Sequence, residues 1–96
     1  MKTAELLIGG REAAARDGRT FDRIDPFTGE VATRAAAASP EDADAAVAAA
    51  KAAFPTWSAL PATERRKRLL KAADVMDSLT GEFIATGIAE TGSTPG

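Results

Sequence analysis

The most informative stretch of the sequence reads TFDRIDPFTGEV, from Thr20 to Val31. Its first five residues mix polar and apolar side chains, with Phe21 and Ile24 apolar, and we interpret them as a half-buried strand. Asp25 followed by Pro26 is a turn signal, and Gly29, three residues after the proline, can adopt a left-handed conformation. From Val31 to Ala38 the sequence favours an extended segment again. The stretch therefore predicts a strand, a turn and a second strand.

The residues before this stretch predict a hairpin. Glu5–Ile8 is a short apolar run that ends at Gly9 and Gly10, and paired glycines accept a positive φ at little cost. Arg11–Ala15 is then expected to be the returning strand. A second turn is expected at residues 16–19, which read Arg, Asp, Gly and Arg.

After residue 38 the pattern becomes helical. Ser39 can cap a helix, Pro40 suits the first helical position, and the acids Glu41 and Asp42 face the positive end of the helix dipole. Apolar residues then recur at helical spacing, at Ala43, Val47, Ala50 and Phe54. We expect Pro55 to end this helix and to leave Trp57 in the connection.

Two more helices are expected. The second runs from about Ala62 to Leu79 and includes Glu64 and Arg68 as a favourable i,i+4 pair. Its apolar stripe consists of Leu69, Ala72, Ala73, Met76 and Leu79. The third begins at Thr80 and passes through Phe83, Ile84 and Ile88. Gly92 is expected to end it, and Pro95 cannot continue it.

The chain is therefore expected to be one α/β segment, residues 1–96, with short strands and turns over 1–38 and three helices over 39–92. Hydrophobic residues make up 45% of it, but many are alanines, which bury little apolar area. A chain of 96 residues already hides a smaller share of its surface than a larger one. We therefore expect this segment to need a partner surface for its apolar faces.

Composition excludes several classes of function. The net charge is −2, from 12 basic and 14 acidic residues, which argues against a dedicated nucleic-acid or anionic-membrane binder. The chain has no cysteine and no histidine, so it offers no thiolate nucleophile, no disulfide and no imidazole base. No apolar run approaches a membrane span or the core of a signal peptide. A cytoplasmic protein is the expectation.

No group of residues identifies a catalytic, cofactor or metal site from the pattern alone. The basic run at residues 65–68 could contact phosphate, but a solvated helix face explains it better. The glycines match no phosphate-binding loop and are interpreted as turn and cap residues. Glu41 with Asp42, and Asp74 with Asp77, are interpreted as a helix start and a solvent face. Trp57 could stack on a ligand, but a packing anchor is the better interpretation.

Several motifs nevertheless occur in the order found at the start of aldehyde dehydrogenases. LIGG at residues 7–10 resembles the family's opening strand and turn. FDRIDPFTGEV at residues 21–31 resembles F-x-x-x-N-P-x-T-G-E-φ, with Asp25 in place of the usual Asn. AVAAAKAAFPTW at residues 46–57 resembles A-φ-x-x-A-x-x-A-F-x-x-W. Pro61, Arg65, Leu69-Leu70 and Glu90-Thr91-Gly92 resemble motifs of the next two helices.

The resemblance implies the N-terminal strands and first three helices of an aldehyde dehydrogenase, a fold with a Rossmann-like cofactor domain. In that family a cysteine attacks the aldehyde, hydride passes to NAD or NADP, and a glutamate activates water. Those residues lie downstream in the family, so this chain is expected to be an inactive, truncated piece. Some members hold a cation through the main-chain carbonyl at the position of Arg23, but the other ligands are missing here.

The resemblance also implies partners. They are the remainder of the polypeptide and other copies of the enzyme in a homo-oligomer, with no nucleic acid and no membrane. Residues 64–84 look most similar to members that act on aromatic aldehydes of the salicylaldehyde and vanillin type. The alternative is a stand-alone helical module that binds another protein through its apolar helix faces. A much weaker third hypothesis is a nucleic-acid contact through residues 65–68.

Overall fold

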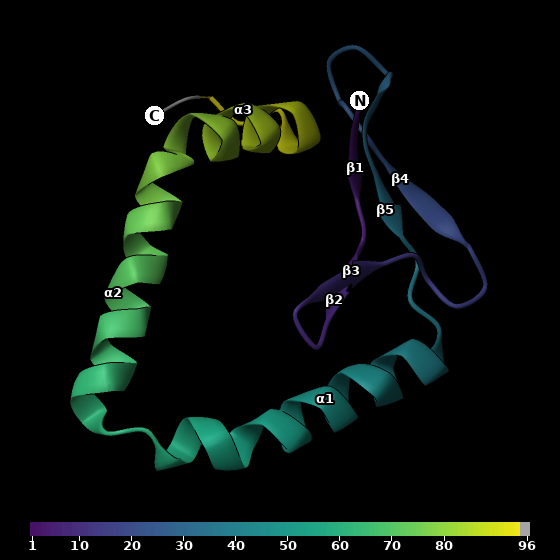
Figure 1. Ribbon diagram of the computed structural model, residues 1–96. Helices are drawn as coiled ribbons and strands as arrows, with labels where there is room; N and C mark the ends of the chain where they lie inside the picture. Colours follow the sequence, from purple (N-terminus) through teal and green to yellow (C-terminus); the bar gives the residue numbers. More distant parts are fainter. Residues whose placement is uncertain (95–96) are drawn as a thin grey trace.

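A computed structural model describes residues 1–94 of the chain. It contains five short strands followed by three helices (Figure 1). The strands are β1 (Lys2–Ala4), β2 (Leu6–Ile8), β3 (Arg11–Ala13), β4 (Thr20–Ile24) and β5 (Val31–Ala36). The helices are α1 (Pro40–Ala59), α2 (Ala62–Ser78) and α3 (Thr80–Thr91). The division into strands and then helices agrees with the sequence pattern, and the fold is α/β.

The strands form two small sheets. One has the order β1-β5-β4, with β1 parallel and β4 antiparallel to β5, and the other is the hairpin β2-β3. The sequence did not predict β1, because Lys2–Ala4 has no apolar alternation; its three residues are exposed. It is extended because it pairs with β5, some thirty residues further along. The returning strand β3 ends at Ala13, two residues earlier than expected.

The turn between β4 and β5 has the chemistry that its sequence predicts. The Asp25 carboxylate accepts a hydrogen bond from the Phe27 N–H at 2.8 Å, and the Gly29 N–H donates to the Asp25 carbonyl at 2.9 Å. Gly29 has φ +75°, a conformation that side chains disfavour and glycine accepts. The side chain of Asp25 thus stabilises the turn locally.

The first helix begins as predicted but ends later. Ser39 and Asp42 form a reciprocal capping box at its start. Pro55, expected to end it, lies inside it, so that expectation is wrong. The φ of a proline suits a helix, and the last turn continues past it to Ala59. Pro61 is the proline that ends the helix, because the residue before a proline avoids helical ψ: Leu60 has ψ 140°.

The other two helices follow the prediction closely. Gly92 caps α3 with φ +73°, as expected of a C-terminal glycine. Gly81 and Gly87, interpreted as turn or cap residues, lie inside α3 instead. The surrounding apolar residues have helical spacing, and that spacing outweighs the cost of about 1 kcal/mol for a glycine in a helix. Pro95 and Gly96 lie outside the described residues.

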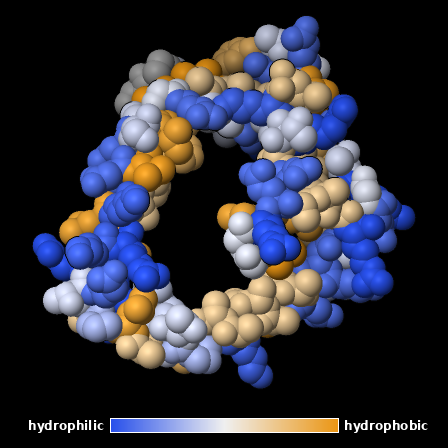
Figure 2. All heavy atoms as spheres, viewed as in Figure 1, coloured by the Kyte–Doolittle hydropathy of each residue, from blue (hydrophilic) through white to orange (hydrophobic). Residues whose placement is uncertain are grey.

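The three helices follow one another round an arc, and the strands lie across its open side (Figure 1). The space-filling view shows an opening through the middle (Figure 2). The chain measures 49 × 36 × 15 Å and has a radius of gyration of 16.8 Å, against roughly 12–13 Å for a compact domain of this size. Within residues 1–94, Ala15 is the single buried apolar residue. The described chain therefore has almost no core of its own.

None of the helices in the described part of the chain is both long enough and apolar enough to span a membrane.

Candidate functional site

The start of α1 is a small network of hydrogen bonds centred on Asp42. Its carboxylate accepts from the backbone N–H of Ser39 at 2.9 Å and from the backbone N–H of Arg16 at 3.0 Å. The Ser39 hydroxyl also donates to it at 3.0 Å. These bonds favour the charged carboxylate, and they lower the pKa of Asp42, the Ser39 backbone bond being the largest cause. Asp42 thus ties the loop after β3 to the first turn of α1.

This helix start does not fit a nucleotide phosphate. A phosphate site needs unpaired backbone N–H groups and a positive local field, but the Asp42 N–H already donates to the Ser39 hydroxyl at 3.2 Å. The Asp42 carboxylate adds negative charge at the same place. The connection from β5 to α1, residues 37–39, contains no glycine. The start of α1 therefore supplies no cradle for a nucleotide phosphate.

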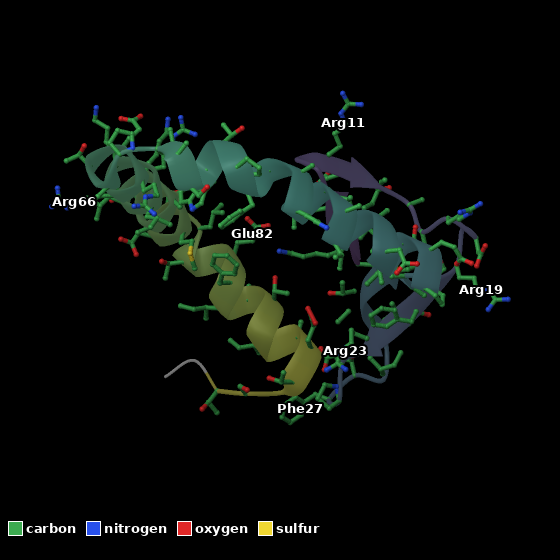
Figure 3. The ribbon with its side chains drawn as sticks, turned by 90° about the horizontal axis from the view of Figure 1, so that it is seen from below. Arg11, Arg19, Arg23, Phe27, Arg66 and Glu82 are labelled. Carbon is green, nitrogen blue, oxygen red and sulfur yellow. The ribbon has the colours of Figure 1, made fainter. Side chains whose placement is uncertain are left out.

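The end of α3 is fixed to the larger sheet by side chains that the sequence did not single out as a site. The Thr33 hydroxyl, on β5 and only 8% exposed, donates to the Glu90 carboxylate at 3.1 Å. The Arg23 guanidinium lies 3.9 Å from the other oxygen of Glu90. Figure 3 shows Arg23 and Phe27 beside this end of the helix. Glu90 therefore joins α3 to both β4 and β5.

Gly92 continues the same contact. A Cβ atom at this position would lie 2.8 Å from a ring carbon of Phe27 and 2.9 Å from the ring of Pro26. Side chains do not tolerate such separations, so the end of α3 approaches the β4–β5 turn as closely as a glycine allows. Glu90-Thr91-Gly92, which resembles a family motif, thus has a structural role: Glu90 and Gly92 hold the same end of α3.

The basic run on α2 borders a groove. The hollow has a volume of about 500 Å³ and is lined by Trp57, Ala62, Arg65, Arg66, Leu69 and Leu70. Trp57 lies in the last turn of α1, where the sequence had placed a connection. The predicted pair of Glu64 and Arg68 is present at 3.9 Å. Arg66 points outward at the far end of the molecule (Figure 3). The groove combines apolar walls with two guanidinium groups.

A second hollow, of about 270 Å³, lies between β1 and α3. Its charged groups already pair with neighbours, since Lys2 Nζ lies 3.1 Å from Glu82 and Glu90 accepts from Thr33. Asp74 and Asp77 are exposed on α2 and take part in no ion pair among residues 1–94. The described residues contain no cluster of acids that could hold a metal ion. The arrangement offers packing and binding surfaces.

Comparison with known proteins shows which class of protein has this fold. Residues 13–95 match the model of the aldehyde dehydrogenase family. This match extends over most of the chain, so the chain belongs to the aldehyde dehydrogenase family. Its strands and helices form the N-terminal part of that family's fold.

Some individual members of the family are similar to this chain over nearly its whole length. The chain is 58% identical over 93 residues to a vanillin dehydrogenase of Pseudomonas fluorescens, and 44% identical over 94 residues to a salicylaldehyde dehydrogenase of Pseudomonas putida. Each match covers 97–98% of this chain and 19% of the relative. The chain therefore spans about a fifth of the length of these curated relatives.

Solved structures agree with the sequence relatives. A crystal structure of a salicylaldehyde dehydrogenase from Pseudomonas putida G7, complexed with salicylaldehyde, superposes with a TM-score of 0.94 at 39% identity. That match covers 99% of this chain and 20% of the other. The protein PnpE, in complex with nicotinamide adenine dinucleotide, superposes with a TM-score of 0.89 at 44% identity. The matching segments of these two solved structures thus have nearly the same open shape as this chain.

Proposed function

We propose that the chain is the N-terminal structural part of an NAD(P)-dependent dehydrogenase that oxidises an aromatic aldehyde to its acid. The observation that supports this most strongly is the 58% identity to a vanillin dehydrogenase across 97% of the chain. The salicylaldehyde complex supports an aromatic substrate, and the PnpE complex supports a nicotinamide cofactor. The cytoplasm as location and a homo-oligomeric assembly stay predictions of the sequence.

The chemistry of the whole enzyme would need groups that this chain lacks. Oxidation of an aldehyde by way of a thioester requires a thiolate nucleophile, a hydride acceptor and a base for the hydrolytic water. The chain has no cysteine, and the start of α1 does not fit a nucleotide phosphate. We therefore expect the purified chain to reduce neither NAD nor NADP with vanillin or salicylaldehyde.

A chimera tests the proposal. The first residues of the Pseudomonas fluorescens vanillin dehydrogenase, over the 93 aligned positions, are replaced by this chain. We expect this chimera to reduce NAD or NADP with vanillin, while the chain alone stays at background. Turnover by the chain alone would contradict its structural role. A soluble chimera that is inactive on every aromatic aldehyde would contradict the assignment to this enzyme class.

A second candidate is a stand-alone helical module that binds another protein. The observation in its favour is the exposure of large apolar side chains on all three helices, including Phe54 at 65% and Met76 at 60%. Such a module would fold alone and bind its partner without any downstream sequence. A well-packed, monomeric chain in solution would favour this candidate over the dehydrogenase part.

A third candidate, contact with nucleic acid, rests on the basic run at residues 65–68. Few phosphates could be neutralised by so short a run in a chain of net charge −2. We expect weak, non-specific binding to duplex DNA at physiological salt. A tight complex in a gel-shift experiment at that salt would contradict this expectation.

A further inference from the structure

The middle helix is the part of the molecule with the least support from its own chain. Strand β2 packs against α1, and strands β4 and β5 pack against α3, whereas the main neighbour of α2 is α3. No residue of α2 is buried. This helix therefore gains little from the strands that hold the other two.

The apolar side chains of α2 nevertheless lie on one face. At 100° per residue, Ala62, Leu69, Ala73 and Met76 share a stripe with Arg65, while Lys71 lies on the opposite side. Leu69 is 61% exposed and Met76 is 60% exposed. A stripe of this kind is the face that a helix normally packs against a core. On α2 it is uncovered.

The groove beside Trp57 lies at the beginning of this stripe, and its two arginines, Arg65 and Arg66, favour an occupant with a negative charge. Of the basic residues in the run at 65–68, Arg68 has an ion pair among residues 1–94, and Arg65 and Arg66 have none. Arg65 is half-buried, so its guanidinium lies beside apolar walls. An occupant that buried this groove would need apolar side chains and a carboxylate, because an unpaired buried charge is costly.

The occupant follows from the comparison with complete enzymes. The superposition on a salicylaldehyde dehydrogenase has a TM-score of 0.94 over 99% of this chain, so the arc is open in the complete enzyme as well. Folding of the arc on itself is therefore not what covers the stripe. The relatives have about four fifths of their length outside the matched part.

We infer that the α2 stripe, defined as Ala62, Arg65, Leu69, Ala73 and Met76, docks an apolar segment that carries a carboxylate. That segment belongs to the remaining four fifths of the aldehyde dehydrogenase polypeptide, and Arg65 pairs with its carboxylate. The inference rests on the proposed function in one respect, namely that the chain works as part of a longer polypeptide.

The chimera with the vanillin dehydrogenase provides the test, with methionine oxidation as the readout. Hydrogen peroxide converts an accessible methionine to its sulfoxide, which mass spectrometry locates. We expect Met76 to react in the chimera on the order of tenfold more slowly than in this chain alone, with a methionyl peptide in each sample as reference. Equal rates in a folded chimera would overturn the inference.

Matched substitutions test the chemistry of the stripe. Leu69→Asp and Arg65→Glu lie on it, whereas Lys71→Asp and Lys67→Glu make comparable changes elsewhere on the same helix. We expect the two stripe variants of the chimera to lose activity on heating about tenfold faster than the two controls, since a negative charge placed in the buried contact destabilises it and raises the unfolding rate. Equal loss in all four would overturn the docking.

The outcomes separate this inference from the proposed function. A chimera that protects Met76 but oxidises no aldehyde would support the docking and contradict the function. An active chimera in which Met76 is not protected would support the proposed function and contradict the docking. Protection of Met76 in the chain alone that grows with its concentration would identify a second copy as the occupant and overturn the inference. An insoluble chimera would also count against it.

Discussion

The first turn of α1 is held by a hydrogen bond to the loop after β3, and the last turn of α3 is held by contacts with strands β4 and β5, whereas no such bond is described for α2. The Asp42 carboxylate accepts a hydrogen bond from the backbone N–H of Arg16, and the Glu90 carboxylate accepts one from the hydroxyl of Thr33. The ion pair described on α2, between Glu64 and Arg68, is internal to the helix. The chain's own polar contacts therefore fix the two ends of its helical half, the start of α1 and the end of α3. Coverage of its apolar faces has to come from elsewhere.

The tied end of α3 should respond most strongly to substitution. Gly92→Ala forces a side chain into the left-handed region, at about 1–2 kcal/mol, and sets its Cβ against Pro26 and Phe27. We expect a total cost of about 2 kcal/mol, or about thirtyfold faster amide exchange at the end of α3 in the chimera. The control is Gly18→Ala, which has a similar φ of +70° in open space.

The prediction depends on the difference in stability cost between the Gly92 and Gly18 substitutions. Gly18→Ala should cost about 1 kcal/mol, from its backbone conformation alone. If both substitutions had the same effect, the contact between α3 and the β4–β5 turn would contribute nothing, and the end of α3 would be no better held than α2.

The tied start of α1 should show a smaller effect. Ser39→Ala removes the hydroxyl that accepts from the Asp42 N–H and is expected to cost about 1 kcal/mol. The readout is amide exchange in the first turn of α1. Ser58→Ala serves as control, because the Ser58 hydroxyl donates only to the Pro55 carbonyl within the same helix. Equal exchange in the two variants would contradict the role of the capping box.

Acidification should have a smaller effect, on the start of α1 through Asp42 and on the pairing of β4 with β5 through Asp22 and Arg34. The pKa of Asp22 is lowered by its hydrogen bond from Arg34, and that of Asp42 by its backbone bonds, from an ordinary value of 3.8. Their stabilisation is therefore complete above the ordinary pKa and is lost as the pH falls through the lowered values. We expect helicity at 222 nm to fall as the pH drops below 3.8, because the Asp42 carboxylate belongs to the cap of α1.

Asparagine variants separate these two carboxylates from the other acids. Asp22→Asn with Asp42→Asn should give lower helicity at pH 7 and a flatter acid profile than the unaltered chain. A profile that keeps its full slope in the double variant would show that other groups carry the pH dependence.

Local chemistry decides which parts of this structure can be predicted from the sequence. The Asp25 turn, the Ser39 cap and the Gly92 stop each depend on a few neighbouring residues, and all three were predicted correctly. Strand β1 depends on pairing with β5, and the Thr33–Glu90 bond joins residues 57 positions apart. Such pairings leave no local pattern in the sequence, so neither of them could be predicted from it.

The end of α1 was predicted wrongly for a different reason. A proline within a helix and a proline after its end give the same local signal, and the choice between Pro55 and Pro61 depends on the residues around them. Leu60, the residue before Pro61, is extended, whereas Phe54, the residue before Pro55, remains helical. Trp57 consequently lies on the helix and borders the groove, a position that the sequence had not indicated.

The most direct test of the central claim is a thermal melt of the purified chain, followed by circular dichroism at several concentrations. A segment whose helices lack a core of their own should give a helical spectrum, a broad transition and association that increases with concentration, because its apolar faces stay exposed. A sharp two-state melt of a soluble monomer, with well-dispersed amide signals, would contradict the account and would favour a stand-alone module.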